Sequence, residues 1–320
     1  MLLTGATGFV GRAVRPALAR AGWRVRGLSR HAAEARRRWP GLEWVAGDVG
    51  DEASCARALA GCTAALYLVH GMGEGPGYQA REVTQARRFA RAAATAGIER
   101  IVYLGGVAPP PGDASAHLRS RLAVGETLRA GIVPTLELRA SMIIGHGSLS
   151  WLIVRDLAAR LPVMVLPSWL RSRTQPVAID DVTVALTRAL ALPVAELEGS
   201  CWFDLPGPET LSGREILEET ARVLGRPRPR MLEVPLLTPR LSSLWVRFVT
   251  RADWAVAREV VVGLTADLLA RDARYWELID HPRLLPFAEA ARRALAAERR
   301  EARPAHGAWA AIERALARGA

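Results

Sequence analysis

The chain of 320 residues contains no lysine and no asparagine. All 43 of its basic residues are therefore arginine, and against 32 acidic residues they give a formal net charge of +11. Such a charge is compatible with nucleic acid, an acidic membrane surface or phosphorylated ligands. The arginines, however, are spread through expected helices and are not interleaved with aromatic residues on one face. The sequence therefore argues against nucleic-acid binding.

Cysteine and long apolar runs are also scarce. The three cysteines, Cys55, Cys62 and Cys201, form no pair at metal-ligand spacing, so we expect neither a metal site nor a disulfide framework. A reducing compartment suits this usage. The richest apolar segment, residues 161–170, is interrupted by two prolines, and no signal peptide precedes the first motif. We expect a cytoplasmic protein with no integral membrane segment.

A glycine-rich loop stands at the start of the chain. Residues 4–11 read TGATGFVG and follow a short apolar strand expected at Leu2-Leu3. Val10, Val14 and Leu18 then recur at helical spacing. Glycines at such spacing let the backbone turn tightly and approach a pyrophosphate, which the N-terminus of the next helix attracts. The strand–loop–helix context predicts a dinucleotide-binding site.

Short apolar runs alternate with longer helical stretches over the first 140 residues. This alternation predicts an α/β fold with a doubly wound parallel sheet, and therefore a Rossmann domain over residues 1–145. The expected strands are 2–3, 24–28, 42–45, 64–69, 101–104 and 135–138, and the expected helices are 10–21, 51–60, 79–97 and 116–130.

The alternation of apolar runs and helical stretches ends after Gly145. Residues 146–172 and 206–300 are expected to form a smaller C-terminal lobe that holds the substrate, while residues 173–205 return to the Rossmann domain. Ligands of open α/β sheets bind at the carboxyl ends of the strands, where this lobe would lie. Residues 301–320 form an Arg- and Ala-rich tail.

The residues after the second and third strands bear on the choice of nucleotide. Ser29 and Arg30 follow the second strand, where an acidic residue would favour NAD and an arginine pairs with a 2′-phosphate. NADP(H) is therefore favoured over NAD(H), unless Arg30 simply points to water. Asp48 and Val49 follow the third strand, where a carboxylate can accept the adenine amino group. Asp48 can equally be a helix cap.

Taken in order, these motifs resemble the short-chain dehydrogenase/reductase superfamily in its extended and atypical branches. The resemblance spans residues 1–225 and includes the loop, Asp48, and the segments 101–106, 138–145 and 176–182. The stretches YLVH and YLGG, which begin at positions 67 and 103, are similar to NmrA-like proteins and to the NADPH-holding accessory subunit of respiratory complex I. The resemblance implies a Rossmann fold, NAD(P)(H) binding, and hydride transfer in members that keep the catalytic residues.

Those catalytic residues are replaced here. The family places a serine after the fifth strand, where this chain has Gly105-Gly106, and a Tyr-x-x-x-Lys pair on the next helix, where it has His117 and Arg121. Arg121 can keep the lysine's ribose contact. His117 can replace the tyrosine as proton donor, because imidazole titrates near neutral pH. Alternatively, His117 is a helix-surface residue with no catalytic role.

Two functions follow. One is an NADP(H)-dependent oxidoreductase that transfers hydride to or from a small carbonyl-type or quinone-type substrate. The second lobe and the polar residues near the cleft favour this enzyme, which is the function we expect. The alternative is a catalytically silent NADPH-binding regulator or assembly factor, which the missing serine and Tyr–Lys pair favour. The oligomeric state stays open. The predicted catalytic residues are His117 and Arg121, and the predicted cofactor contacts are Gly5, Thr7, Gly8, Phe9, Val10, Gly11, Ser29, Arg30, Asp48, Val49, Val69, His70, Gly105, Arg121 and Ser141.

Overall fold

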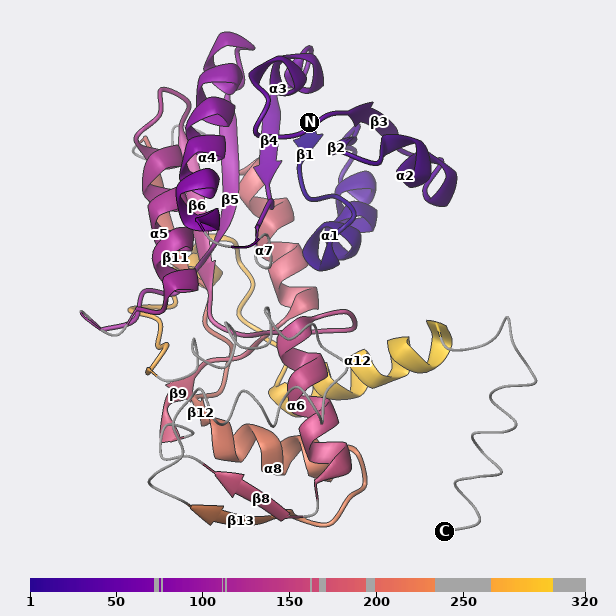
Figure 1. Cartoon of the computed structure of the whole chain (residues 1–320), viewed down its shortest axis with the longest axis vertical. Helices are drawn as coiled ribbons and strands as arrows, with labels where there is room; N and C mark the ends of the chain where they lie inside the picture. Colours follow the sequence, from indigo (N-terminus) through magenta and orange to yellow (C-terminus); the bar gives the residue numbers. More distant parts are fainter. Residues whose placement is uncertain are drawn as a thin grey trace.

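The computed structural model describes residues 1–71, 75, 77–110, 112, 114–161, 163–166, 171–193, 199–233 and 266–301. Seven parallel strands form its central sheet, in the order β11-β6-β5-β4-β1-β2-β3 (Figure 1). They are β1 (Leu2–Leu3), β2 (Arg26–Ser29), β3 (Glu43–Ala46), β4 (Ala64–Tyr67), β5 (Arg100–Gly106), β6 (Thr135–Ala140) and β11 (Cys201–Asp204). The order reverses between β1 and β4, which confirms the doubly wound Rossmann sheet.

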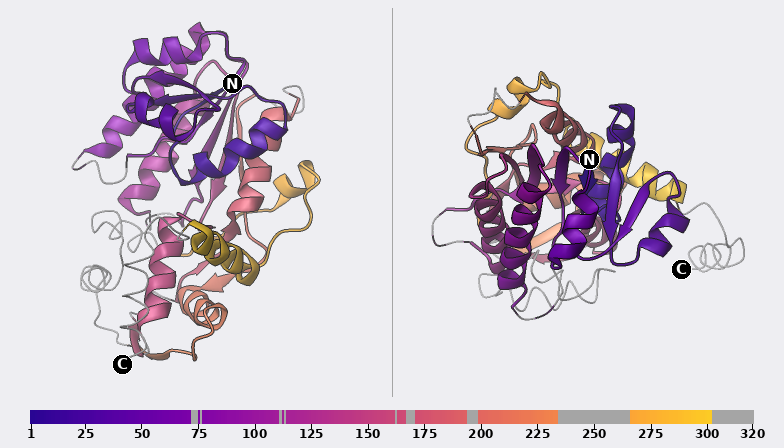
Figure 2. Two further views of the ribbon diagram at one scale, coloured as in Figure 1. Left: turned by 90° about the vertical axis from the view of Figure 1, so that its right-hand side faces the viewer. Right: turned by 90° about the horizontal axis from the view of Figure 1, so that it is seen from above.

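Helices cover both faces of this sheet (Figure 2). On one face α1 (Phe9–Arg20) packs against α7 (Ile179–Ala191). On the other face α4 (Tyr78–Thr95) lies between α3 (Glu52–Leu59) and α5 (Ala116–Arg129). The short α2 (Ala32–Arg38) packs against the neighbouring edge strand β3. The sheet is thus buried on both sides, as parallel sheets generally are.

The two residues of β1 show how the two cores are built. Successive side chains of a strand point to opposite faces, so Leu2 joins the core under α3, α4 and α5, while Leu3 packs with Val14 and Leu18 of α1. All four leucine and valine side chains have no solvent-exposed surface. Burying each of them contributes about 1.5–3 kcal/mol. The loop that follows β1 therefore starts from a fixed point.

A second group of elements lies beyond the carboxyl ends of the strands, in the lower half of Figure 1. Trp151, Ile216 and Phe287 form its hydrophobic cluster, and they come from three different helices. Its elements are α6 (Leu149–Arg160), α8 (Gly213–Val223), α12 (Phe287–Glu301) and the parallel pair of β8 (Val163–Leu166) and β13 (Arg230–Glu233). Short connecting elements are β7 (Ile143–Ile144), β9 (Arg173–Thr174), β10 (Val177–Ala178), β12 (Leu211–Ser212) and α11 (Arg274–Leu278).

The assignment of residues 146–172 and 206–300 as a substrate lobe stays a prediction. Residues 234–265 of that lobe, and the tail from residue 302 on, lie outside the described residues. Within the ranges given above, no helix is both long and apolar enough to cross a bilayer.

Candidate functional site

The loop between β1 and α1 comes so close to its neighbours that only glycine fits at two positions. Gly5 has φ of 64°, and a Cβ atom there would lie 2.7 Å from the carbonyl oxygen of Leu68. A Cβ on Gly11 would lie 2.3 Å from the carbonyl oxygen of Gly5. Gly8 is the N-cap of α1 and offers no capping side chain. The first N–H groups of α1 are therefore open to an anion.

A cleft of about 520 Å³ opens beside this loop. It lies at the carboxyl ends of the strands, where the strand order reverses, and this is where doubly wound sheets bind ligands. Its lining comes from the glycine loop, from the segments that follow β2, β3 and β4, and from α5. The lining residues are Gly5, Thr7, Gly8, Phe9, Val10, Gly11, Leu28, Ser29, Arg30, His31, Gly47, Asp48, Val49, Leu68, Val69, His70, Gly71, Gln85, Leu104, Arg121, Gly147 and Leu149.

Arg30 and Asp48 face each other at one end of the cleft. The Arg30 Nε atom lies 3.8 Å from Asp48 Oδ2, and both side chains are largely exposed. Asp48 also accepts a 2.7 Å hydrogen bond from the Gly50 backbone N–H. It is not the cap of α3, because Asp51 accepts from the N–H groups of Ala53 and Ser54. Of the two roles considered for Asp48, helix capping is therefore ruled out.

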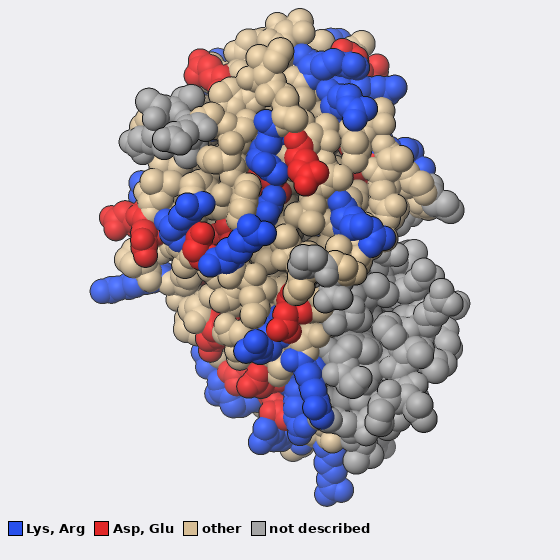
Figure 3. Space-filling model, turned by 90° about the vertical axis from the view of Figure 1, so that its left-hand side faces the viewer, with Lys and Arg blue, Asp and Glu red and all other residues tan. Residues whose placement is uncertain are grey.

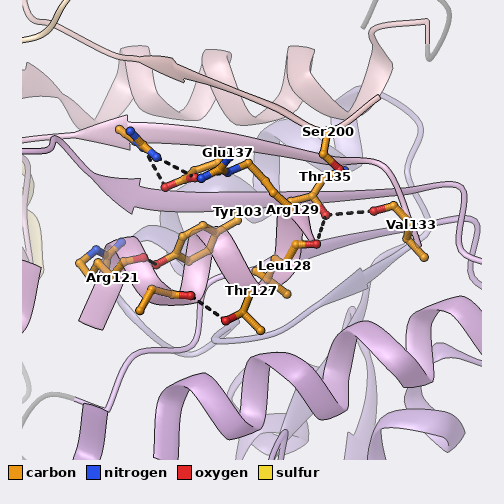
Figure 4. Close-up of polar contacts among 11 residues, drawn as sticks. Tyr103, Arg121, Thr127, Leu128, Arg129, Val133, Thr135, Glu137 and Ser200 are labelled. Carbon is orange, nitrogen blue, oxygen red and sulfur yellow. Dashed lines mark hydrogen bonds and ion pairs between the residues drawn. The ribbon is translucent and has the colours of Figure 1, made fainter. Parts of the chain in front are cut away.

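Arg121 lies where α5 meets the cleft, and its backbone and side chain are both held. Its guanidinium donates to the carbonyl oxygen of Leu104, at the end of β5. Its own carbonyl accepts a 3.0 Å hydrogen bond from the Tyr103 hydroxyl, and the guanidinium carbon stands 5.9 Å from that ring's centroid (Figure 4). The position of this positive charge is thus fixed by β5.

Next to His70 and Ser120 lies a buried carboxylate that the sequence analysis did not single out. Glu82 of α4 accepts hydrogen bonds from His70 Nδ1 at 2.8 Å, from the Gly71 N–H at 2.6 Å and from the Ser120 hydroxyl. Burial by itself raises its pKa, but these hydrogen bonds and the nearby His70 lower the pKa to about 2. Glu82 is therefore ionised at neutral pH and acts only as an acceptor.

His117 packs against His70 rather than lining the cleft. The two rings are 4.7 Å apart between centroids and tilted by 53°. The buried Nδ1 atom of His117 has no hydrogen-bond partner within the described part of the chain. Burial, and then the charges of Arg121 and His70, lower its pKa to about 3. The expectation that this imidazole titrates near neutral pH is therefore wrong, although its catalytic role stays open.

A buried carboxylate also explains the glycine at the family's serine position. Glu137 of β6 is fully buried and is paired with Arg129 at 2.8 Å and with Arg139 at 2.9 Å (Figure 4). A Cβ on Gly105 would lie 2.7 Å from Glu137 Oε1, and one on Gly125 would lie 2.4 Å from the same atom. Gly105 thus makes room for a structural ion pair.

The structure brings most of the predicted cofactor residues to one cleft. Three predicted residues, Gly105, Ser141 and His117, do not line it. Gly105 lies against Glu137, and Ser141 donates a hydrogen bond to the Gln175 carbonyl oxygen. His117 packs against the ring of His70. The sequence analysis missed the lining residues Leu28, His31, Gly47, Leu68, Gly71, Gln85, Leu104, Gly147 and Leu149.

Two further observations concern metal ligands and surface charge. Over the described ranges, no group of three or more His, Cys, Asp or Glu side chains is placed to hold a metal ion. On the face shown in Figure 3, arginines alternate with acidic side chains over a mostly uncharged surface. Such alternation does not form a continuous basic stripe like those that track a nucleic-acid backbone.

Comparisons with known proteins agree with this site. Residues 5–158 match a family of NAD(P)H-binding proteins. The (4-alkanoyl-5-oxo-2,5-dihydrofuran-3-yl)methyl phosphate reductase of Streptomyces griseus is 32% identical over 71% of this chain and 74% of its own. The ceramide reductase of Caulobacter vibrioides is 30% identical over 73% of each chain.

A solved structure shares the fold. The triphenylmethane reductase of Citrobacter sp., complexed with NADP(H), superposes with a TM-score of 0.69 at 18% identity and covers 92% of this chain and 99% of its own. The glycine loop, the cleft and the two reductase relatives lead to one conclusion: the chain belongs to the family of NAD(P)H-binding proteins that residues 5–158 match.

Proposed function

We propose that the protein is an NADP(H)-dependent reductase that acts on a carbonyl group of a small, acyl-bearing molecule. One observation carries the proposal: a single cleft is lined both by the glycine loop at the N-terminus of α1 and by Arg121 and His70. A phosphate-binding end and a polar, proton-bearing end therefore share one cavity. This is the arrangement that hydride transfer to a carbonyl requires.

The residues present fit a dinucleotide. Gly5 and Gly11 let the loop pack tightly against Leu68 and against its own backbone, next to the uncapped N-terminus of α1, where a pyrophosphate would bind. When bound, the reduced dinucleotide supplies a hydride. Arg121 would hold the nicotinamide ribose, because the Leu104 carbonyl already fixes its guanidinium. Arg30 would pair with the 2′-phosphate, which favours NADP(H) over NAD(H).

The two related reductases suggest that the substrate bears an acyl group. One of the two reductases acts on an alkanoyl-bearing phosphate and the other on ceramide, which is an N-acylated lipid. Both align with this chain over most of its length. The elements beyond the carboxyl ends of the strands, with α6 at their centre, would receive that acyl chain. Quinones are the alternative substrate class.

A specific observation also favours a second function, that of an NADPH-binding regulator. Gly105 occupies the position of the family's serine, and Glu137 occupies the space that a side chain at this position would need. The usual serine hydroxyl is therefore absent from the cleft. A regulator of this kind would bind NADPH and would not oxidise it.

Two measurements separate the two functions. Calorimetry with NADPH and NADH gives affinity and preference, with Gly8→Val as the variant that should not bind. The absorbance of NADPH then follows turnover of acyl-bearing ketones, lactones, aldehydes and quinones. Oxidation that depends on such a substrate supports the reductase. Tight NADPH binding with no oxidation over the whole panel supports the regulator.

A further inference from the structure

Glu82 is an acidic side chain buried inside the protein, next to the cleft residue His70. A carboxylate with 5% of its surface exposed is costly to bury unless it is hydrogen-bonded, and Glu82 has three donors around it. Two of them, His70 and Gly71, belong to the segment after β4, and the third, Ser120, belongs to α5. Glu82 thus ties the end of β4 to two helices at the point where the cleft begins.

The hydrogen bond between His70 and Glu82 determines which nitrogen of the His70 ring carries the proton. An ionised carboxylate only accepts hydrogen bonds, so His70 Nδ1 must carry the proton in the 2.8 Å contact. In the neutral ring Nε2 is then unprotonated, and a second proton can be held only at Nε2. Within the described residues, Glu82 from α4 lies at hydrogen-bond distance from the ring, and the His117 ring from α5 packs against it. Of these, Glu82 is the one that stabilises a protonated ring.

We propose that His70 is the proton donor for the substrate's carbonyl oxygen and that Glu82 is the residue that positions it. The proposal rests on the reductase function above. His70 lines the same cleft as Arg121 and the glycine loop. It would therefore replace the family's tyrosine, although it comes from the segment after β4 rather than from α5.

In the proposed step the substrate's carbonyl group gains a hydride at carbon and a proton at oxygen. The carbonyl carbon accepts a hydride from the reduced dinucleotide, which is thereby oxidised, and the π electrons of the carbonyl move to its oxygen. The Nε2–H bond of the His70 imidazolium breaks as the new O–H bond forms. The ring is left neutral, with its other proton still on Nδ1 and donated to Glu82. His70 Nε2 is shielded from solvent in the structure, so a proton from solvent would return to it as the product leaves.

His117 is the competing donor, and the geometry favours it less. Within the described residues, the buried Nδ1 atom of His117 has no partner, carboxylate or other. His70 Nε2 is buried as well, so the contact with Glu82, and not burial, distinguishes the two rings. The positive Arg121 on the same helix disfavours a charged His117. His117 instead provides a neutral ring against which His70 packs at 4.7 Å.

The test compares four variants of the whole chain: His70→Gln, His117→Gln, Glu82→Gln and Ser120→Ala. His70→Gln should lower kcat by roughly 10²–10⁴-fold, the usual worth of a general acid, with KM and NADPH affinity unchanged. Glu82→Gln removes the charge at equal size and should lower kcat by at least roughly 10²-fold. Ser120→Ala removes a different donor to the same carboxylate and should cost at most about tenfold. This variant controls for a merely structural role of the cluster.

A second readout does not depend on turnover. Nitrogen-15 NMR of the histidines, with the His70 signals assigned by their loss in His70→Gln, reports which ring nitrogen holds the proton. We expect a neutral His70 protonated at Nδ1 in the wild type and a mixture of tautomers in Glu82→Gln.

The outcomes separate the two proposals. A larger loss of kcat in His117→Gln than in His70→Gln, or a Glu82→Gln variant as active as Ser120→Ala, overturns the inference. So does a wild-type His70 protonated at Nε2 in its neutral form, whatever the turnover. A wild-type protein that binds NADPH and reduces nothing overturns the proposed reductase function itself.

Discussion

Replacing Gly125 by alanine should destabilise this protein, although the same change stabilises most helices. Gly125 lies inside α5, and alanine is favoured over glycine in a helix interior by roughly 0.8–1 kcal/mol. The added Cβ, however, would lie 2.4–2.5 Å from both carboxylate oxygens and the carboxyl carbon of Glu137. Real Cβ atoms do not approach so closely, so Glu137 must move.

Glu137 cannot move without losing its partners. It is fully buried and is held by Arg129 at 2.8 Å and by Arg139 at 2.9 and 3.2 Å. Breaking a buried ion pair costs about 3–5 kcal/mol, because one charge is left without compensation. After the gain in helix propensity is subtracted, Gly125→Ala should lower the free energy of unfolding by about 2–4 kcal/mol.

Urea unfolding of the wild type and of Gly125→Ala measures this difference. The control is the same substitution in a Glu137→Ala background, where the carboxylate is gone. There Gly125→Ala should be stabilising, by roughly the propensity difference of 0.8–1 kcal/mol. A neutral or stabilising effect in the wild-type background would refute the reasoning, since it would mean that Glu137 is not pinned.

Four further outcomes are expected. Gly8→Val should abolish NADPH binding in calorimetry, because its side chain fills the pyrophosphate space, and an unchanged affinity would contradict the dinucleotide site. Arg30→Ala should weaken NADPH by about 1.5–3 kcal/mol and leave NADH almost unaffected, whereas equal losses would show that Arg30 does not read the 2′-phosphate. Arg121→Ala should weaken both nucleotides alike, through the ribose, and a loss confined to one of them would argue against that contact. The lowered pKa of His117 means that the unfolded chain binds more protons between pH 6.5 and about 3, so the wild type loses stability as pH falls through that window. His117→Gln should reduce this loss in urea unfolding followed against pH.

The parts of the fold that could be predicted from the sequence are those set by local pattern. Each strand expected in the first 140 residues is present within about two residues, because its apolar run and the glycines beside it are local signals. The short helix α2 was missed. It is rich in arginine and buries only Ala32 and Ala35, so it carries little amphipathic pattern.

The polar residues behind the cleft were missed for a different reason. Glu82 reads as one more charge in a charged helix, and its burial depends on Ser120, which lies 38 positions away. A signal was nevertheless present, because Glu82, Ala86, Phe89 and Ala93 share the helical spacing of one apolar face and all are buried. An acidic residue on such a face requires partners, and the sequence did not identify them.

Two departures from the family pattern in this chain differ in kind. The serine position is closed by packing, because Glu137 occupies the space next to Gly105, and any side chain there would disturb a buried ion pair. The tyrosine position remains beside the cleft, but its histidine is held neutral by burial and by Arg121. The hydrogen-bonded imidazole that lines the cleft is instead His70, oriented by a carboxylate from a third element, α4. Loss of the usual residues on β5 and α5 is therefore compatible with catalysis, because the proton donor can come from the segment that follows β4.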